Sequence, residues 1–247
     1  MDNQTREYAQ QNLTLPHDVV PLPSGGLFYK NKKQSIKVGY LTAMDENIIL
    51  GSNNDIATTL LRHKIYEPDF KVEDMLEGDV EAVLIFLRNT SFGPEIDLNV
   101  VDPVTKKTFK TTVRIDQLPI IKGEDPNHDG TFSLKLPTSG AELKLRLLTI
   151  GEVNEIDKII TSYPKGRVAP VVTLKLQKQI VELNGSSDLG EIAKFVEQMP
   201  IADSKHIKKF LKSNEPRLDM SKEVIAPSGE RLTVNVGFGV DFFRPFF

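Results

Sequence analysis

Residues 136–160, "LPTSGAELKLRLLTIGEVNEIDKII", combine a turn, a strand pattern and a helix start. A proline-containing turn opens it, and leucines then alternate from Leu143 to Leu147, which predicts a half-buried strand. Thr149 stands three residues before Glu152, which is the spacing of a capping box, so a helix is expected to begin directly after the threonine. The stretch therefore predicts a unit of turn, strand and capped helix.

The same unit occurs near the start of the chain. There, "LPSG" at 22–25 precedes an alternating apolar pattern at 36–40, and Thr42 follows where that strand is expected to end. Asp45 stands three residues after Thr42, where its charge favours the positive end of a helix dipole, although aspartate is outside the strict capping-box pattern. A second copy of turn, strand and helix is therefore expected.

Each unit is followed by further helices and a closing hairpin. Apolar residues recur at helical spacing over 54–65 and 79–90 in the first half and over 168–183, 188–198 and 204–212 in the second. Strand patterns then flank a turn at Asp102–Pro103 in the first half and a turn at 226–229 in the second. We interpret this shared order as an internal duplication with an α+β fold, in which each half pairs short antiparallel strands and a hairpin with a helical segment. Chance recurrence of short motifs is the alternative.

The predicted organisation has four parts. They are a flexible N-terminal arm over 1–20, a first α+β subdomain over 21–121, a linker loop and strand over 122–135, and a second α+β subdomain with a phenylalanine-rich tail over 136–247.

The linker "KGEDPNHDG", residues 122–130, partly matches a calcium-binding loop. The oxygen-bearing residues and the glycine of such a loop are present as Asp125, Asn127, Asp129 and Gly130. However, Leu136 stands where a bidentate glutamate is required, and the preceding residues indicate a strand instead of a helix. A solvated, turn-rich linker is the favoured interpretation, and no metal site is predicted.

Composition excludes several classes of protein. The chain has 247 residues, of which 39% are apolar and 26% charged, as in ordinary globular proteins. No apolar run approaches the roughly 18 residues of a membrane span, and the polar start lacks the layout of a secretion signal, so no membrane association is expected. The chain has no cysteine, which excludes disulfides, thiolate metal sites and cysteine nucleophiles.

No motif indicates catalysis. The histidines, His17, His63, His128 and His206, are scattered, and none is spaced as a metal-binding pair on one helix face. The sequence contains no nucleophile elbow, no Walker-type phosphate loop and no Rossmann glycine pattern. An acid–base pair built from distant parts of the chain stays open, but the expectation is a non-enzymatic protein without a cofactor.

Two basic segments raise nucleic-acid binding as an alternative. "KKTFKTTVR", 106–114, is expected on a strand, and "SKHIKKFLK", 204–212, on a short helix. A lysine-bearing helix with an apolar stripe is usually a surface helix docked on its own core. The net charge of −3 and the lack of clustered aromatic residues on strands disfavour a nucleic-acid partner.

The C-terminus, "GFGVDFFRPFF", is unusually aromatic. Its last six residues hold Phe242, Phe243, Phe246 and Phe247. These rings either pack on the protein's own core or fill pockets on a partner, with Pro245 restricting the freedom of the tail. We expect both, with the inner rings packed on the protein's own core and the outer rings available for docking.

A second apolar run, Leu27, Phe28 and Tyr29, follows the glycines of the first turn. Three bulky apolar residues in a row are too continuous for a half-solvated strand. Burial in the core is the favoured interpretation, and contact with a partner is the alternative.

These residues carry a resemblance to a known family. "LPSGGLFY" at 22–29, "LTAMDENIIL" at 41–50, "EGDVEAVLIFLRNTSFG" at 77–93 and the "FFRPFF" end resemble the baseplate hub assembly proteins of T-even-type contractile-tailed bacteriophages. In that family the proline hairpins can carry paired cysteines in a zinc knuckle. Here the matching positions, 102–105 and 226–229, hold no cysteine, so the resemblance implies that packing and hydrogen bonds take the place of any metal.

The resemblance implies a protein of tail morphogenesis in the host cytoplasm or in the virion baseplate. It would bind baseplate hub proteins and promote hub assembly by docking instead of bond chemistry. A permanent structural subunit of the tail is the second interpretation, and a nucleic-acid-binding module or an undetected enzyme is the third. Because a tail that fits a partner can also fit a second copy, self-association stays open.

Overall fold

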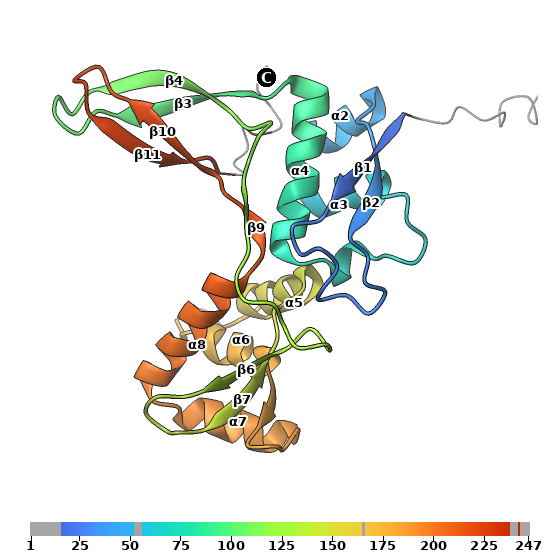
Figure 1. Ribbon diagram of the computed structural model, residues 1–247, viewed down its shortest axis with the longest axis vertical. Coiled ribbons are helices and arrows are strands. Elements are labelled where there is room, and N and C mark those ends of the chain that lie inside the picture. Colours follow the sequence, from blue (N-terminus) through green and yellow to red (C-terminus); the bar gives the residue numbers. More distant parts are fainter. Residues whose placement is uncertain (1–15, 52–55, 165, 238–241, 243–247) are drawn as a thin grey trace, which may run out of the picture.

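The computed structural model describes residues 16–51, 56–164, 166–237 and 242. It consists of two lobes and a projecting arm of β-hairpins (Figure 1). The described chain is made of helices and short antiparallel hairpins, which confirms the α+β fold predicted from the sequence. The duplication remains an interpretation.

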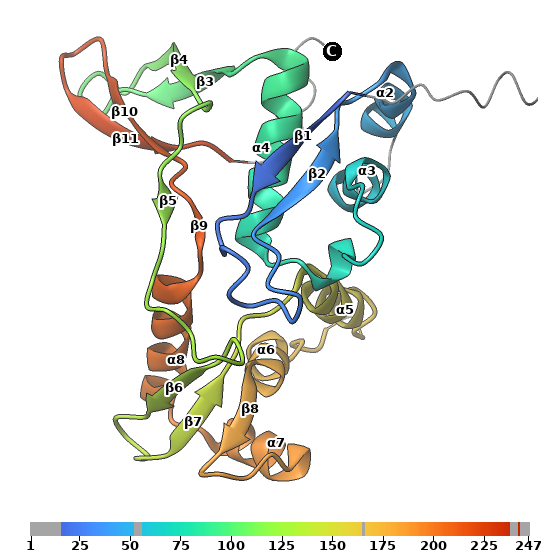
Figure 2. The ribbon, with the colours of Figure 1, turned by 45° about the vertical axis from the view of Figure 1, so that its right-hand side comes forward.

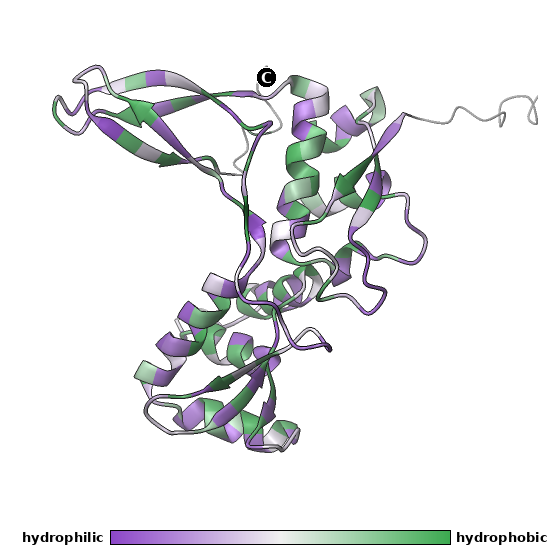
Figure 3. Cartoon of the chain, viewed as in Figure 1, coloured by the Kyte–Doolittle hydropathy of each residue, from purple (hydrophilic) through white to green (hydrophobic). Residues whose placement is uncertain are grey.

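The first lobe combines a two-stranded sheet with helices. Strand β1 (His17–Pro21) pairs antiparallel with β2 (Ser35–Gly39), and the helical elements are α2 (Ala43–Leu50), α3 (Ile56–Lys64), the 3-10 helix η1 (Val72–Asp74) and α4 (Glu77–Phe92). Helix α4 contacts β1, and much of it is coloured as apolar in Figure 3. Its buried residues include Val83 and Leu87, neither of which is exposed to solvent. This helix therefore forms the centre of the first lobe.

The second lobe has a three-stranded antiparallel sheet in the order β6-β7-β8. The strands are β6 (Phe132–Lys135), β7 (Glu142–Leu145) and β8 (Ile180–Leu183), and the helices are α5 (Ile150–Thr161), α6 (Val171–Gln179), α7 (Leu189–Gln198) and α8 (Ile201–Asn214). Figure 2 shows β6 to β8 with α6, α7 and α8 around them.

The arm is built from one hairpin of each half of the chain. Strands β3 (Glu95–Val101) and β4 (Thr108–Arg114) form the first hairpin, and β10 (Ser221–Ile225) and β11 (Arg231–Asn235) form the second. The two lie side by side, with β10 contacting β4, and point away from both lobes (Figures 1 and 2). The short strands β5 (Ile120–Ile121) and β9 (Arg217–Leu218) pair antiparallel where the chain runs between arm and second lobe.

Both predicted helix starts are confirmed. The backbone N–H of Thr149 donates to Glu152 Oε2 at 3.1 Å, and the N–H of Glu152 donates to Thr149 Oγ1 at 3.4 Å, which is the reciprocal pair of a capping box. At the start of α2, the N–H and hydroxyl of Thr42 donate to Asp45 Oδ2 at 2.7 and 2.8 Å. Local sequence therefore determines where both helices begin.

One predicted helix was too long. The pattern at 168–183 predicted a single helix, but α6 ends at Gln179 and residues 180–183 form β8. Leu145 of β7 pairs with Ile180, and both side chains are buried, so pairing with a distant strand overrides the local helical pattern. None of the helices in the described parts of the chain combines the length and apolar composition needed to cross a bilayer.

The N-terminal arm expected over 1–20 lies outside the described residues as far as residue 15. Its last residues belong to β1, where Val20 is buried opposite Ile36 of β2. The predicted linker, 122–135, is a loop followed by β6.

The lobes join where α4 and α5 begin. Leu76, just before α4, forms an isolated antiparallel bridge with Thr149, just before α5. The N–H of Ile150 donates to the carbonyl of Met75 at 2.8 Å. Gly78 of α4 lies against the backbone of Pro216, which leads into β9. Backbone contacts, which no side-chain rotation can relax, therefore fix the junction.

Carboxylates of both lobes meet at this junction. Burial is the main cause that raises the pKa of Glu81 to about 7, and the negative charges of Glu77 and Glu215 add to the rise. The positive charge of Arg217 offsets only part of this rise. Burial, followed by the charge of Glu77, raises the pKa of Glu215 as well. At neutral pH the ionisation of Glu81 therefore opposes folding.

We expect the Glu81→Gln variant to be more stable than the wild type at pH 8, by about 1 kcal/mol after allowance for solvent screening. The folded state binds a proton at Glu81 more tightly than the unfolded state, so the wild type loses stability as pH rises from the ordinary glutamate range through about 7. Urea unfolding at pH 5 and pH 8 measures this. An equal difference between the two proteins at both pH values contradicts it.

Candidate functional site

The first turn, "LPSG" at 22–25, is held in place by a buried aspartate. The N–H of Ser24 donates to Oδ1 of Asp79 at 2.9 Å, and the hydroxyl of Tyr29 donates to Oδ2. Asp79 is the third residue of α4 and has no solvent exposure. The Tyr29 oxygen also accepts the N–H of Leu76 at 3.0 Å, just before α4. The loop after Leu22 is thereby fixed to the start of α4.

The second proline turn has the same arrangement. The N–H groups of Thr138 and Ser139 donate to Oδ1 and Oδ2 of Asp203 at 2.8 and 2.9 Å. Asp203 is the third residue of α8 and is likewise fully buried. In each half, the turn between two paired strands is therefore bound by the third residue of the helix that precedes the arm hairpin.

The two aspartates differ in electrostatics. Burial raises the pKa of Asp79 despite its hydrogen bonds with Ser24 and Tyr29. At Asp203, burial acts in the same direction, but hydrogen bonds from Thr138 and Ser139 outweigh it and lower the pKa. Asp203 is thus the better-stabilised anion of the two.

The predicted contact residues after the first turn occupy three environments. Tyr29 is buried and bound to Asp79 as described above. Phe28 is half-buried, and its ring centroid lies 5.8 Å from that of Phe132 of β6. Leu27 is 39% exposed. The loop therefore ties the first lobe to the second, and a contact between these residues and a partner stays a prediction.

The predicted C-terminal contact residues fall mostly outside the described residues. Phe242 is described, is 4% exposed and belongs to the apolar core. Phe243, Phe246 and Phe247 lie outside the described residues. Phe242 therefore contributes to the protein's own core, as expected of an inner ring.

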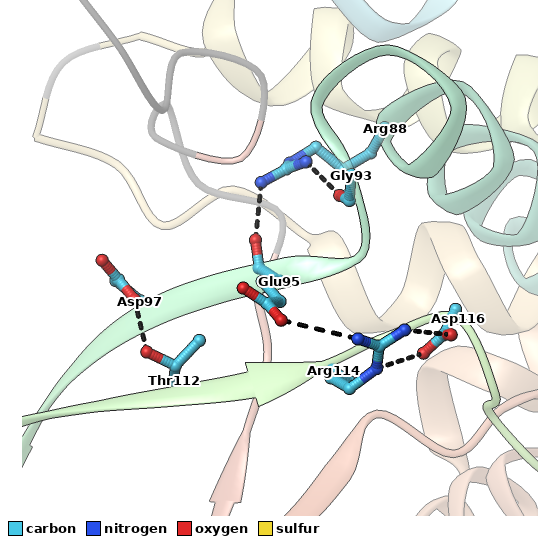
Figure 4. A network of polar contacts seen from close by, with 7 residues as sticks. All are labelled: Arg88, Gly93, Glu95, Asp97, Thr112, Arg114 and Asp116. Carbon is cyan, nitrogen blue, oxygen red and sulfur yellow. Dashed lines mark hydrogen bonds and ion pairs between the residues drawn. The ribbon is translucent and has the colours of Figure 1, made fainter.

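The root of the arm is fixed by two arginines (Figure 4). Arg88 of α4, almost fully buried, donates to the carbonyl oxygens of Gly93 and Glu95, the latter at 2.9 Å. Arg114 of β4 pairs with Asp116 at 2.7 Å and with the Glu95 carboxylate at 3.4 Å. The first hairpin is therefore held at a defined angle to α4.

The far ends of the two hairpins are joined by a clasp, which consists of Asp102 and Ser228. The hydroxyl and N–H of Ser228 donate to Asp102 Oδ1 and Oδ2 at 2.9 and 3.1 Å. Asp102 also accepts the N–H groups of Val104 and Thr105 at 2.8 and 3.1 Å. Partial desolvation raises the pKa of Asp102, but these hydrogen bonds together outweigh it and lower that pKa to about 2. Hydrogen bonds to an ionised carboxylate thus join the turns at 102–105 and 226–229.

In the calcium-like linker, the Asp129 carboxylate is bound within the protein. Asp129 accepts both the N–H and the hydroxyl of Thr131 at 3.2 and 2.5 Å, and it pairs with Lys144 at 2.7 Å. Throughout the described ranges, no group of three or more histidine, aspartate or glutamate side chains is placed to hold a metal ion.

Exposed apolar residues near the two arm turns were not predicted from the sequence. Val101, Val104 and Ile225 lie within three residues of Asp102 or Ser228 in the chain and are largely exposed. The available signal was apolar residues beside turns, where polar residues are usual. Apolar residues beside a turn indicate little by themselves, and the sequence does not show that the turns of Asp102 and Ser228 meet.

Comparison with known proteins identifies the family. Residues 22–243 match the family described as T4 bacteriophage base plate protein. The match covers most of the chain, which belongs to this family. No curated protein and no solved structure matched.

Membership confirms the resemblance to phage baseplate proteins. It indicates association with the virion baseplate and interaction with other baseplate proteins.

Proposed function

We propose that this protein binds subunits of the baseplate hub and promotes hub assembly by protein–protein docking, during morphogenesis in the host cytoplasm. The observation that carries the proposal is the match to the phage base plate family over residues 22–243. Docking would lower the entropic cost of bringing hub subunits together, without making or breaking covalent bonds.

Two segments are proposed as contacts. Phe242 is buried and anchors the root of the aromatic C-terminal segment, so Phe243, Phe246 and Phe247 are proposed to reach the partner. Leu27 is 39% exposed, more than its neighbours Phe28 and Tyr29, and is proposed as a further contact. Tyr29 and Phe28 would support that loop from within.

The test is co-expression with each hub subunit of the same phage, followed by size-exclusion chromatography and native mass spectrometry. A variant that ends at Phe242 keeps the buried ring and removes only the outer phenylalanines. Co-elution of the intact protein with a hub subunit, and loss of that complex in the folded variant, is the expected result. If the intact protein binds no hub subunit, the proposed function is wrong.

A permanent structural subunit of the baseplate is the second candidate. The family description, which names a base plate protein without an assembly role, favours it. Mass spectrometry of purified particles separates the two, since only a permanent subunit is retained at a fixed copy number.

We also propose that the two halves derive from a duplication, with subdomains at 21–121 and 136–247. The matching aspartates, Asp79 and Asp203, support this, as does the contribution of one arm hairpin by each half. The hairpins pack together, so the proposed subdomains are joined at the arm as well as at the lobe junction.

A further inference from the structure

The second lobe has a groove where it meets the first lobe. The groove is lined by side chains of α5, α6 and α8 and by Glu77, the first residue of α4, and its volume is about 390 Å³. Residues from all four helices therefore line one continuous cavity. Its volume lies within the range of roughly 300–1,000 Å³ that is typical of binding pockets.

Much of the groove lining is apolar. This apolar lining comes from the segment before α5 and from α5, α6 and α8, and it includes Leu147, Val153, Val171, Val172, Leu176 and Leu211. The three leucines are buried, whereas Val172 is 45% exposed. Apolar surface in an open groove is favourable to cover, so the lining is suited to the apolar side chains of a partner.

Lysines of two helices also line the groove. Lys208 and Lys212 lie about one turn apart on α8, and Lys175 belongs to α6. Within the described parts of the chain, none of the three forms an ion pair. Glu77 and Glu215 are the carboxylates of the lining, so three lysines outnumber two glutamates and the groove is positive in a chain of net charge −3.

The lysines of α8 form two pairs. Lys208 and Lys212 line the groove, whereas Lys205 and Lys209 are exposed and do not line it. Each pair has the spacing of neighbours on one helix face. Solubility explains both pairs equally well, but it does not explain why the first pair lies beside an apolar cavity.

We propose that this groove binds an apolar segment of another baseplate protein, and that this segment carries an acidic residue. Its apolar side chains would cover Val172 and the leucines, and its carboxylate would pair with the lysines of α8. Charge complementarity selects an acidic partner over a basic one, and the apolar lining favours a protein over nucleic acid, whose surface is charged throughout. This inference rests on the proposed function and adds a binding surface to it.

The test measures binding of each purified baseplate subunit of the same phage to variants of the full chain. Val172→Glu places a charge in the apolar lining, and Ile159→Glu is its matched control. Both residues are β-branched, lie on helices of the second lobe and have similar exposed fractions, 45% and 42%, but Ile159 does not line the groove.

A second pair of variants tests the charge of the groove. Lys208→Glu/Lys212→Glu reverses two charges of its lining, and Lys205→Glu/Lys209→Glu makes the same change in net charge on the same helix outside the groove. All four lysines are exposed, so these variants test the groove even if Val172→Glu lowers stability. Thermal melting verifies that each variant is folded.

For a subunit bound by the wild type, we expect Val172→Glu and Lys208→Glu/Lys212→Glu each to weaken binding by about tenfold or more. The two controls should leave binding within about threefold of the wild type. Glu77→Gln should strengthen binding by about twofold, because it removes a charge that repels the acidic residue of the partner. Binding should also weaken as the salt concentration rises.

Several results would overturn the groove inference and leave the proposed function intact. If Val172→Glu and Lys208→Glu/Lys212→Glu bind as tightly as the wild type, the subunit docks elsewhere. If both lysine reversals weaken binding equally, the lysines act through overall charge and not through the groove. If Glu77→Gln weakens binding tenfold, the partner segment is basic.

Two further results concern the identity of the partner. If the wild type forms a dimer that Val172→Glu dissociates, the groove holds a second copy of this chain, and its assignment to a baseplate partner is wrong. If the wild type binds no baseplate subunit, both the groove inference and the proposed function fail.

Discussion

Replacing Asp79 by alanine is expected to lower the free energy of unfolding by about 3 kcal/mol. The carboxylate accepts the Ser24 N–H and the Tyr29 hydroxyl, and the site is closed to water. Without it, two buried donors lose their acceptor, and each unsatisfied buried group costs about 1–3 kcal/mol. The raised pKa of Asp79 shows that burial of the charge has its own cost, which keeps the loss below the sum of both bonds.

Guanidinium chloride unfolding measures this loss, with two comparisons. Asp69→Ala, at an exposed position of the same lobe, should change stability by no more than about 0.5 kcal/mol. Asp203→Ala should destabilise the protein as well, because it removes the acceptor of two turn amides. An Asp79→Ala protein as stable as the Asp69→Ala protein would mean that water or a shifted loop satisfies the freed donors.

Sequence predicted those parts of the fold that depend on neighbouring residues. The helix start at Thr149 needs a partner only three residues away, and the hairpin turn at Asp102 needs its own two strands. Strand β8 was predicted as helix because its pairing with β7 comes from a segment about 35 residues earlier in the chain. The structure provides that pairing partner, which no local pattern contains.

In the candidate site, too, contacts between neighbouring residues could be predicted and contacts between distant segments could not. The duplicated "LP" turns were visible in the sequence, but their aspartates were not, because Asp79 and Asp203 lie 55 and 65 residues from the amides of Ser24 and Thr138. The contact between Asp102 and Ser228 spans 126 residues. Aromatic composition did point to the C-terminal segment, yet it could not show that Phe242 is buried.

Replacing Gly78 by alanine is expected to lower the free energy of unfolding by about 3 kcal/mol, despite the higher helix propensity of alanine. A Cβ atom on Gly78 would lie 2.0 Å from the carbonyl oxygen of Pro216 and 2.9 Å from Cα of Arg217. Both are backbone atoms, so α4 and the segment entering β9 must move apart. Equilibrium unfolding in denaturant measures the loss.

Gly190→Ala is the matched control, since Gly78 and Gly190 are the second residues of α4 and α7. The nearest atom to a Cβ at Gly190 is the side-chain oxygen Oδ1 of Asp188 at 3.1 Å, which has to shift only slightly, so the stability of this variant should change by less than about 1 kcal/mol. Equal stabilities for the two variants would show that the backbone at the lobe junction can move apart at little cost.

Because β9 leads directly into the second arm hairpin, a junction that opens at Gly78 should also alter the position of the arm relative to the lobes. Hydrogen exchange should then be faster in β5 and β9 of the Gly78→Ala protein than in the same strands of the Gly190→Ala protein.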